Sequence, residues 1–203
     1  TSYKSSDSYI FFPLHYQPEA TNYPHGDVFI DQILALKMLS SHLPEKLKIL
    51  VKEHPDTFNM SRTAWTAGTH GRYYSYYENL SKIKNLKILD LKLNSLDLIK
   101  NSYCVATITG TSAIESLFFN KYSIIFGDAW YEKMSEGFKK YENFNDLENF
   151  FKKIENINQT DSNEFSKFIE SLENNSVNLS KSGGYQSYIE EFNNLVGLFE
   201  KKI

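Results

Sequence analysis

The sequence predicts an α/β fold of the Rossmann-like type, in which a doubly wound parallel sheet is covered by helices on both faces. Two observations predict it. Between residues 9 and 127, short apolar runs alternate with helical patterns, which is the element order of successive βαβ units. The runs are almost continuously apolar, as parallel strands buried on both faces are. We therefore expect a Rossmann-like core at 1–140 and C-terminal helices at 141–203 that pack on the same domain.

Each expected element rests on its own local pattern. Five short apolar runs bounded by turn residues are expected as strands: 9–14 (YIFFPL), 47–51 (LKILV), 85–91 (NLKILDL), 103–109 (YCVATIT) and 122–127 (YSIIFG). Between and after them, apolar residues at helical spacing predict helices at 27–43, 71–83, 95–101, 112–119, 145–156, 162–174 and 185–203. Strand and helix therefore alternate up to the fifth strand, and only helices are expected beyond residue 140.

Composition narrows the class of protein. The 203 residues are 41% hydrophobic and 23% charged, which is globular and enough for one domain. A net charge of -3 and a pI near 6.0 argue against a nucleic-acid partner, which usually needs a basic surface. Cys104 is the single cysteine, so no disulfide framework is expected and a reducing cytoplasm fits. No apolar run approaches the roughly 20 residues that span a bilayer, and peripheral membrane attachment stays open.

Candidate site residues follow the predicted strands. In open parallel sheets, ligands bind beyond the carboxyl ends of the strands, where helix N-termini converge. The residues at these positions are Gln17 and Glu19 after the first strand, Lys52, His54 and Pro55 after the second, and Thr109, Gly110, Thr111, Ser112 and Glu115 after the fourth. Polar, small and proline-fixed residues thus gather at one predicted edge.

His54 precedes Pro55, which disfavours helical backbone and gives the loop a defined direction. Its imidazole can donate a hydrogen bond to a phosphate or a sugar hydroxyl, and Lys52 can add positive charge. The alternative is that His54 only ends the strand and caps the next loop. A dipeptide by itself does not decide between the two.

The stretch 109–112 carries a strand into a helix with small and hydroxyl-bearing residues, which lets a phosphate approach the backbone. It matches neither the GxGxxG fingerprint nor the P-loop. Glu115 has two interpretations. With Ser112 it has the spacing of a capping box, a structural role, whereas one turn into the helix it can also accept hydrogen bonds from a ribose diol.

Other residues are weaker candidates. His15 and His25 can contact sugar or phosphate, or can be structural. They lack a second cluster of ligands, so no metal is expected. Arg72 is interpreted as either a phosphate clamp or a surface charge. Trp130 either walls the pocket or closes the core.

Four segments in this order carry a resemblance: FFPLHYQPEA (11–20), GDVFIDQILALKMLSSHLP (26–44), KILVKEHP (48–55) and TITGTSAIESLFFNKYSIIFGDAWY (107–131). Together they resemble the C-terminal, donor-binding half of bacterial glycosyltransferases of capsule and surface-polysaccharide biosynthesis, the family that includes the Kdo transferases of capsule linkers. The likeness covers roughly residues 9–135. The His-Pro element and the Ser/Thr-rich turn are also similar to those of sialyltransferases and polyglycerol-phosphate polymerases, which use cytidine-nucleotide donors.

The resemblance implies a GT-B enzyme, with two Rossmann-like domains across a cleft and the nucleotide-sugar bound by the C-terminal one. It implies that Lys52, His54 and Pro55 form a nucleotide-binding element, that 109–112 is the phosphate-side turn, and that Glu115 contacts ribose or cytidine. Gln17 and Glu19 then belong to a loop that faces the cleft. A CMP-activated, Kdo-like ulosonic acid is the expected donor, with no metal or other cofactor.

The expected partners are this donor, a glycan or glycolipid acceptor, and an N-terminal acceptor-binding domain. The 203 residues cannot hold both domains, so we expect the chain to be the donor-binding half, inactive alone, with its catalytic base elsewhere. We expect a cytoplasmic location, at the inner face of the membrane if attached. A non-catalytic glycan- or partner-binding module and a UDP-sugar-dependent transferase or epimerase remain alternatives. The sequence leaves the donor base, acceptor, stereochemistry and oligomeric state open.

Overall fold

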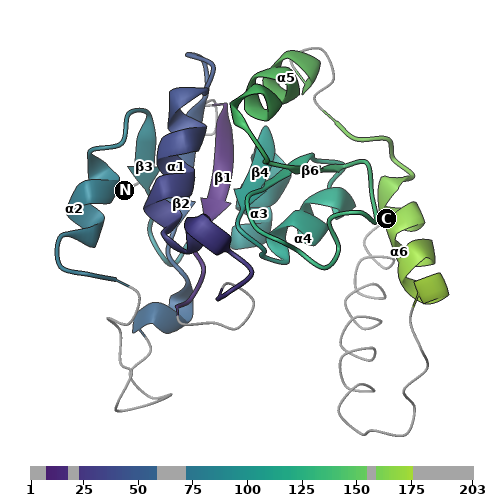
Figure 1. Ribbon diagram of the computed structural model, residues 1–203, viewed down its shortest axis with the longest axis horizontal. Helices are drawn as coiled ribbons and strands as arrows, with labels where there is room; N and C mark the ends of the chain where they lie inside the picture. Colours follow the sequence, from purple (N-terminus) through teal and green to yellow (C-terminus); the bar gives the residue numbers. More distant parts are fainter. Residues whose placement is uncertain (1–7, 18–22, 59–71, 155–158, 176–203) are drawn as a thin grey trace, which may run out of the picture. The chain divides into compact units, whose positions relative to one another are not determined.

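The computed structural model describes residues 8–17, 23–58, 72–154 and 159–175. Within these ranges, six strands form one parallel sheet in the order β3-β2-β1-β4-β5-β6 (Figure 1). The strands are β1 (Tyr9–Pro13), β2 (Lys48–Lys52), β3 (Leu86–Ile88), β4 (Cys104–Thr107), β5 (Ser123–Ile125) and β6 (Phe138–Lys140). This is the strand order of the doubly wound, dinucleotide-binding fold, so the predicted fold class is confirmed.

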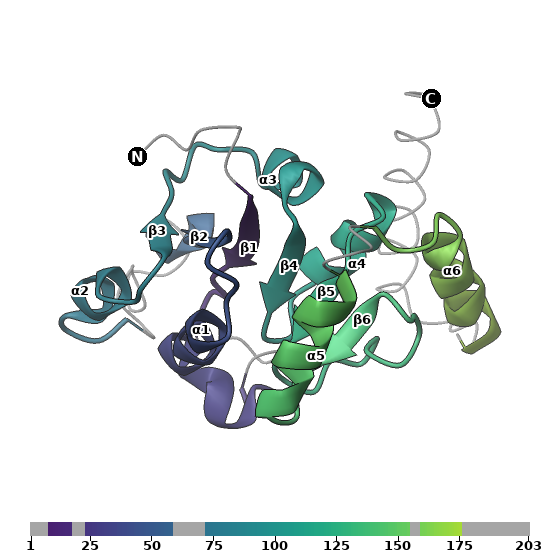
Figure 2. The same cartoon turned by 90° about the horizontal axis from the view of Figure 1, so that it is seen from above.

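Helices cover both faces of the sheet. The described helices are α1 (Gln32–Ser41), α2 (Tyr76–Ser81), α3 (Ser95–Asn101), α4 (Ser112–Phe118), α5 (Phe144–Ile154) and α6 (Glu164–Asn175), with short 3-10 helices η1 (Asp27–Ile30) and η2 (Pro55–Phe58). Figure 2 shows α1, α2 and α5 on one face of the sheet and α3 and α4 on the other.

The two faces have separate apolar cores because side chains alternate along a strand. On β1, Ile10 and Phe12 join the larger core, which includes residues of α1, α2 and α5, whereas Tyr9 and Phe11 join a smaller core with residues of α3. All four side chains are 0–1% exposed. A central strand buried on both faces explains why its sequence reads as a continuous apolar run.

The crossover between the two halves of the sheet fixes where a ligand can bind. The chain runs outward from β1 to β3 on one side and from β4 to β6 on the other, while β1 and β4 are adjacent. At such a topological switch point, the loops after the two central strands diverge and leave a crevice at their carboxyl ends. A ligand at this edge would therefore contact residues that follow β1 and β4.

Three differences between the predicted and the observed elements have a clear local cause. The expected helix 27–43 is split, because the Asp31 side chain accepts a hydrogen bond from the Ile33 amide and starts α1 anew. The helix expected at 71–83 spans only 76–81, after Ser75 in a left-handed conformation (φ 68°). β6 was not predicted, because a three-residue strand with one apolar residue, Phe138, carries almost no periodic signal.

The chain divides into two compact units, residues 1–169 and 170–203. The sheet and helices α1 to α5 belong to the first unit. The third expected tail helix, 185–203, lies outside the described residues, so the expected division at residue 140 stays a prediction. In the described part of the chain, no helix has the length and apolarity to cross a membrane.

Candidate functional site

A cavity of about 750 Å³ opens at the carboxyl edge of the sheet, within the range of small-molecule sites. Residues that follow β1, β2, β4 and β5 meet there. Its lining comprises Phe11, Pro13, Leu14, His15, His25, His54, Pro55, Ser95, Ile99, Thr107, Thr109, Gly110, Thr111, Ser112, Glu115, Asp128, Ala129 and Trp130. Seven predicted site residues therefore line one cavity: His54, Pro55, Thr109, Gly110, Thr111, Ser112 and Glu115.

His54 is oriented by its own loop. Its Nδ1 accepts a hydrogen bond from the Asp56 amide (3.2 Å), while its backbone N–H donates to Glu53 Oε1 (2.8 Å). In the neutral ring, an accepting Nδ1 leaves the proton on Nε2. His54 thus caps the loop that follows β2 and also lines the cavity, so the structural role leaves room for a ligand contact.

Lys52 lies behind the cavity wall rather than on it. Its ammonium donates to Ser95 Oγ (2.8 Å), and Ser95 is part of the lining. Burial lowers the pKa of Lys52, since desolvation disfavours the charged form. The expected contact between Lys52 and a phosphate stays a prediction.

The turn 109–112 brings the backbone close to the cavity at Gly110. A Cβ added there would lie 2.7 Å from Thr107 Oγ1 and 3.1 Å from His15 Cε1, closer than a side chain tolerates. The Gly110 amide donates to Thr107 Oγ1 (3.1 Å), and the Tyr131 hydroxyl donates to the Gly110 carbonyl (2.5 Å). The turn is therefore held from both sides.

The capping box considered for Ser112 and Glu115 is not formed. Helix α4 has Thr111 as its N-cap, so Ser112 is the first helical residue, and its Oγ is buried without a hydrogen-bond partner among the described residues. Burial raises the pKa of Glu115, although a hydrogen bond from the Thr111 side chain partly opposes this effect. Glu115 lines the cavity, where its carboxylate can meet a ligand hydroxyl.

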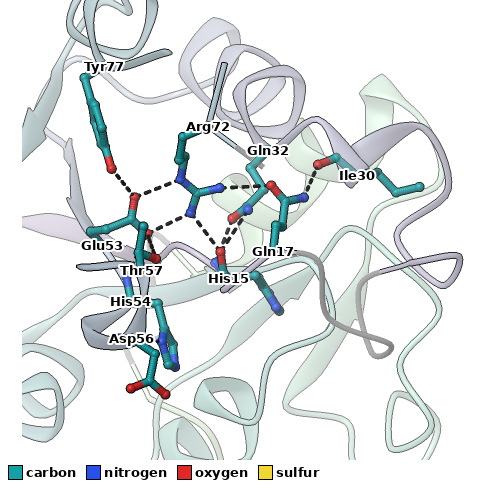
Figure 3. Close-up of polar contacts among 10 residues, drawn as sticks. All are labelled: His15, Gln17, Ile30, Gln32, Glu53, His54, Asp56, Thr57, Arg72 and Tyr77. Carbon is teal, nitrogen blue, oxygen red and sulfur yellow. Dashed lines mark hydrogen bonds and ion pairs between the residues drawn. The ribbon is translucent and has the colours of Figure 1, made fainter. Parts of the chain in front are cut away.

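A buried ion pair supports this edge of the sheet (Figure 3). Arg72 Nη2 and Nε contact the Glu53 carboxylate at 2.7 and 2.9 Å, and both side chains are 4% exposed. Arg72 is therefore buried and not a surface charge, and it is not part of the cavity lining, so its interpretation as a phosphate clamp stays a prediction. Gln17 belongs to the same network: its Oε1 accepts from Arg72 Nη1 (2.9 Å), and its Nε2 donates to the Ile30 carbonyl (2.7 Å).

Gln17 is accordingly outside the cavity lining, and Glu19 lies outside the described residues. Sequence reasoning missed Glu53. The available signal was a carboxylate directly after an apolar strand, because a buried charge requires a partner. Arg72 supplies it from 19 positions away, a pairing that no local pattern indicates.

His15 is more firmly fixed than its loop position indicated. Its backbone N–H donates a hydrogen bond to Gln32 Oε1 (2.8 Å), and its carbonyl accepts one from Gln32 Nε2 (3.2 Å). Its Nε2 lies 2.9 Å from Thr107 Oγ1. Burial lowers the pKa of His15 to about 4, assisted by the charges of His54 and Arg72.

The cavity is equipped to bind an anion that carries hydroxyl groups. Imidazole, hydroxyl and amide donors suit a phosphate, Glu115 suits a diol, and the 63% exposed Trp130 offers an aromatic face at the rim. Among the described residues, no group of three or more His, Cys, Asp or Glu side chains is placed to hold a metal ion.

The strand order and the cavity define a doubly wound α/β domain with a cavity at its switch point. A family model described as "Capsule polysaccharide biosynthesis protein" matches residues 15–154. That match covers more than half of the chain, and the chain belongs to this family. No curated protein matches the chain.

Similar solved structures include UDP-GlcNAc 2-epimerase from Methanocaldococcus jannaschii in complex with UDP-GlcNAc and UDP, at 14% identity and a TM-score of 0.51, over 83% of this chain and 46% of that one. The Neisseria meningitidis enzyme bound to UDP-GlcNAc aligns at 13% identity and 0.50, over 85% and 46%. Thermosulfurimonas dismutans KpsC, beta Kdo 2,4 transferase, aligns at 13% and 0.49, over 83% and 45%. This chain spans less than half the length of each.

Proposed function

We propose that this chain is the nucleotide-sugar-binding half of a glycosyltransferase of capsular or surface-polysaccharide biosynthesis, with a CMP-activated, Kdo-like ulosonic acid as donor. The observation that carries the proposal is the convergence of His54, the turn 109–112 and Glu115 on one cavity. Membership of the capsule polysaccharide biosynthesis family supports the biological setting.

The chemistry assigned to this half is donor binding and leaving-group stabilisation. As the sugar departs, negative charge grows on the nucleotide phosphate, and preorganised donors lower the energy of that state. His54 Nε2–H and the small residues of the turn would face this charge, and Glu115 would orient the ribose. The acceptor, a glycan or glycolipid, and the catalytic base would belong to a second domain at the cytoplasmic face of the membrane.

A UDP-sugar donor is the second candidate. Two of the similar solved structures, the enzymes from Methanocaldococcus jannaschii and Neisseria meningitidis, are bound to UDP-GlcNAc, and the first is also bound to UDP. These likenesses concern the fold, and the cavity's hydrogen-bond groups for phosphate and diol serve either nucleotide. Binding measurements with cytidine and uridine nucleotides therefore decide the nucleobase of the donor.

The test is thermal unfolding of the chain with CMP, CDP, UDP, GDP and AMP in turn. A ligand at about 100 times its dissociation constant stabilises the folded state by about 2.7 kcal/mol. We expect cytidine nucleotides to raise the midpoint and His54→Ala to abolish the shift. His42→Ala is the matched control, because His42 follows α1 and is not part of the lining. Stabilisation by UDP alone would change the donor, and a full shift in His54→Ala would contradict the assigned site.

A further inference from the structure

His15 has one ring nitrogen that no described residue contacts by a hydrogen bond. Its Nε2 lies 2.9 Å from Thr107 Oγ1 and 3.5 Å from the Thr109 amide nitrogen, which donates to it. Its Nδ1 has no hydrogen-bond partner among the described residues. It is also not one of the unpaired side-chain atoms of these residues that are closed off from solvent. The ring lines the cavity, so this nitrogen borders the space a ligand would fill.

The partners of Nε2 fix the tautomer. A backbone amide can only donate, so the Nε2 that accepts from Thr109 carries no proton. The Thr107 hydroxyl accepts from the Gly110 amide at 3.1 Å, which leaves its own hydrogen free for His15 Nε2. In a neutral imidazole the proton must then be on Nδ1. His15 is therefore an Nδ1–H donor toward the cavity.

Two features keep His15 in this neutral state. Burial, together with the charges of His54 and Arg72, lowers its pKa to about 4, well below neutral pH. Protonation would also place a hydrogen on Nε2, directed at the Thr109 amide. The ring is thus a hydrogen-bond donor without a net charge over the pH range in which the protein would work.

His54 shows the complementary arrangement. Its Nδ1 is occupied by the Asp56 amide at 3.2 Å, so its donor is Nε2–H. In the view of Figure 3, both imidazoles lie on the same side of the Arg72–Glu53 pair. Both rings also line the same cavity. His15 Nδ1–H and His54 Nε2–H are thus two donors directed to one space, from the ends of β1 and β2.

We propose that His15 is a ligand-binding residue whose Nδ1–H donates to a phosphoryl oxygen of the bound nucleotide, as a partner to His54 Nε2–H. The position supports phosphate, because one edge of the His15 ring faces this turn: Cε1, which joins the two ring nitrogens, and Nε2 lie 3.1 and 3.3 Å from where a Cβ on Gly110 would be. An anion at the turn 109–112 is therefore within reach of this donor. This inference rests on the proposed function, since it assigns a contact within the same nucleotide site.

The test compares two substitutions that divide the functions of the ring. His15→Gln retains an acceptor near the position of Nε2 and removes the Nδ1 donor, whereas His15→Asn retains a donor near Nδ1 and removes the Nε2 acceptor. We expect His15→Gln to lose affinity for CMP or UDP on the order of 10- to 100-fold, the effect of one hydrogen bond to a charged group. His15→Asn should lose less affinity but more thermal stability. His42→Gln serves as the control.

A second readout does not depend on any nucleotide. Long-range ¹H–¹⁵N correlation spectra of the chain distinguish imidazole tautomers, and we expect Nδ1–H for His15 at pH 7. An Nε2–H tautomer for His15 would overturn the inference, as would wild-type affinity in His15→Gln. If His54→Ala loses nucleotide and His15→Gln does not, only this inference fails. If the wild-type chain binds neither CMP nor UDP, the proposed function fails and the assigned contact fails with it.

Discussion

Arg72 and Glu53 form a two-point ion pair that joins three segments at the carboxyl edge of the sheet. Glu53 also accepts hydrogen bonds from Thr57 Oγ1 (3.1 Å) and Tyr77 Oη (2.8 Å). Arg72 donates to the His15 carbonyl (2.8 Å), and its guanidinium lies 4.7 Å from the centre of the Tyr76 ring. The pair therefore sets the positions from which His15 and His54 enter the cavity.

Removal of one partner of this pair should be costly. We expect Arg72→Met to lower the free energy of unfolding by about 3–5 kcal/mol, because it leaves the Glu53 carboxylate buried and unpaired. Denaturant unfolding measures this change. The double substitution Arg72→Met with Glu53→Gln should recover part of the loss, since it removes the uncompensated charge.

The exposed pair Lys82–Glu78, at 2.8 Å, is the matched control. Lys82→Met should change stability by less than about 1 kcal/mol, as is typical of surface ion pairs. An equal loss in Arg72→Met and Lys82→Met would contradict the role assigned to burial.

Stability should fall in mild acid because of His15. Its folded-state pKa is about 4, below the ordinary value of 6.5, so between these values the unfolded chain binds a proton that the folded chain does not. The free energy of unfolding should therefore decrease as the pH falls from 6.5 to 4, by about 3 kcal/mol for this group. His15→Gln should remove this part of the pH dependence, whereas an unchanged profile would indicate that His15 is solvated.

Glu53 adds a second acid-sensitive contribution at lower pH. Burial alone would raise its pKa, but the hydrogen bonds and charge of Arg72, with further hydrogen bonds from the His54 amide and Tyr77, hold it below the ordinary 4.5. Its stabilisation is complete above pH 4.5 and is lost as the pH falls through the folded-state value. The acid unfolding of Glu53→Gln should lack this lower step.

Glu115→Gln should stabilise the chain and weaken ligand binding. Because burial raises the pKa of Glu115 above 4.5, the folded state disfavours the charged form. The loss of folding stability caused by ionised Glu115 therefore begins as the pH rises above 4.5, and it persists at pH 7. We expect a higher melting midpoint at pH 7 for the variant, a smaller difference near pH 4, and a lower nucleotide affinity. A variant with both lower stability and full affinity would refute the assigned contact.

Gly110→Ala and Ser112→Ala should have different effects on stability and nucleotide affinity, although both positions lie in one turn. Alanine at 110 brings Cβ within 2.7 Å of Thr107 Oγ1, so we expect a loss of 1–3 kcal/mol, the usual cost of overpacking, and reduced binding. Ser112→Ala removes a buried hydroxyl without a partner. It should leave stability equal or higher, and lower affinity only if the hydroxyl contacts the ligand. Calorimetric unfolding and nucleotide titration of both variants check this pair.

The alternation of apolar runs and helical patterns was enough to predict the central strands and α3, whose observed bounds, Ser95–Asn101, match the expected range. These elements have strong local signals because they are buried on one or two faces. β6 has almost no such signal, since it pairs with β5 at the sheet edge and contributes mainly Phe138 to the core. Its existence depends on a neighbouring strand.

Seven of the ten site residues predicted from the sequence line the cavity, because the carboxyl ends of parallel strands share one edge of the sheet. The sequence could not place Lys52 behind Ser95, nor Gln17 in the network of Arg72. Strand periodicity identifies the edge where a residue emerges. It does not identify the partner that its side chain meets there.

By itself, the sequence determined the α/β class, the edge of the sheet that carries the site and the small-residue turn that approaches it. Those properties follow from local periodicity and backbone preferences. Only the tertiary structure decided which polar groups are free for a ligand. Glu53 is neutralised by Arg72, and one ring nitrogen of His15 is bonded to Thr107 of β4. Both facts arise from contacts between segments that are distant in the sequence. Burial strengthens the hydrogen bonds in these contacts, and unpaired polar groups among the described residues remain at the cavity.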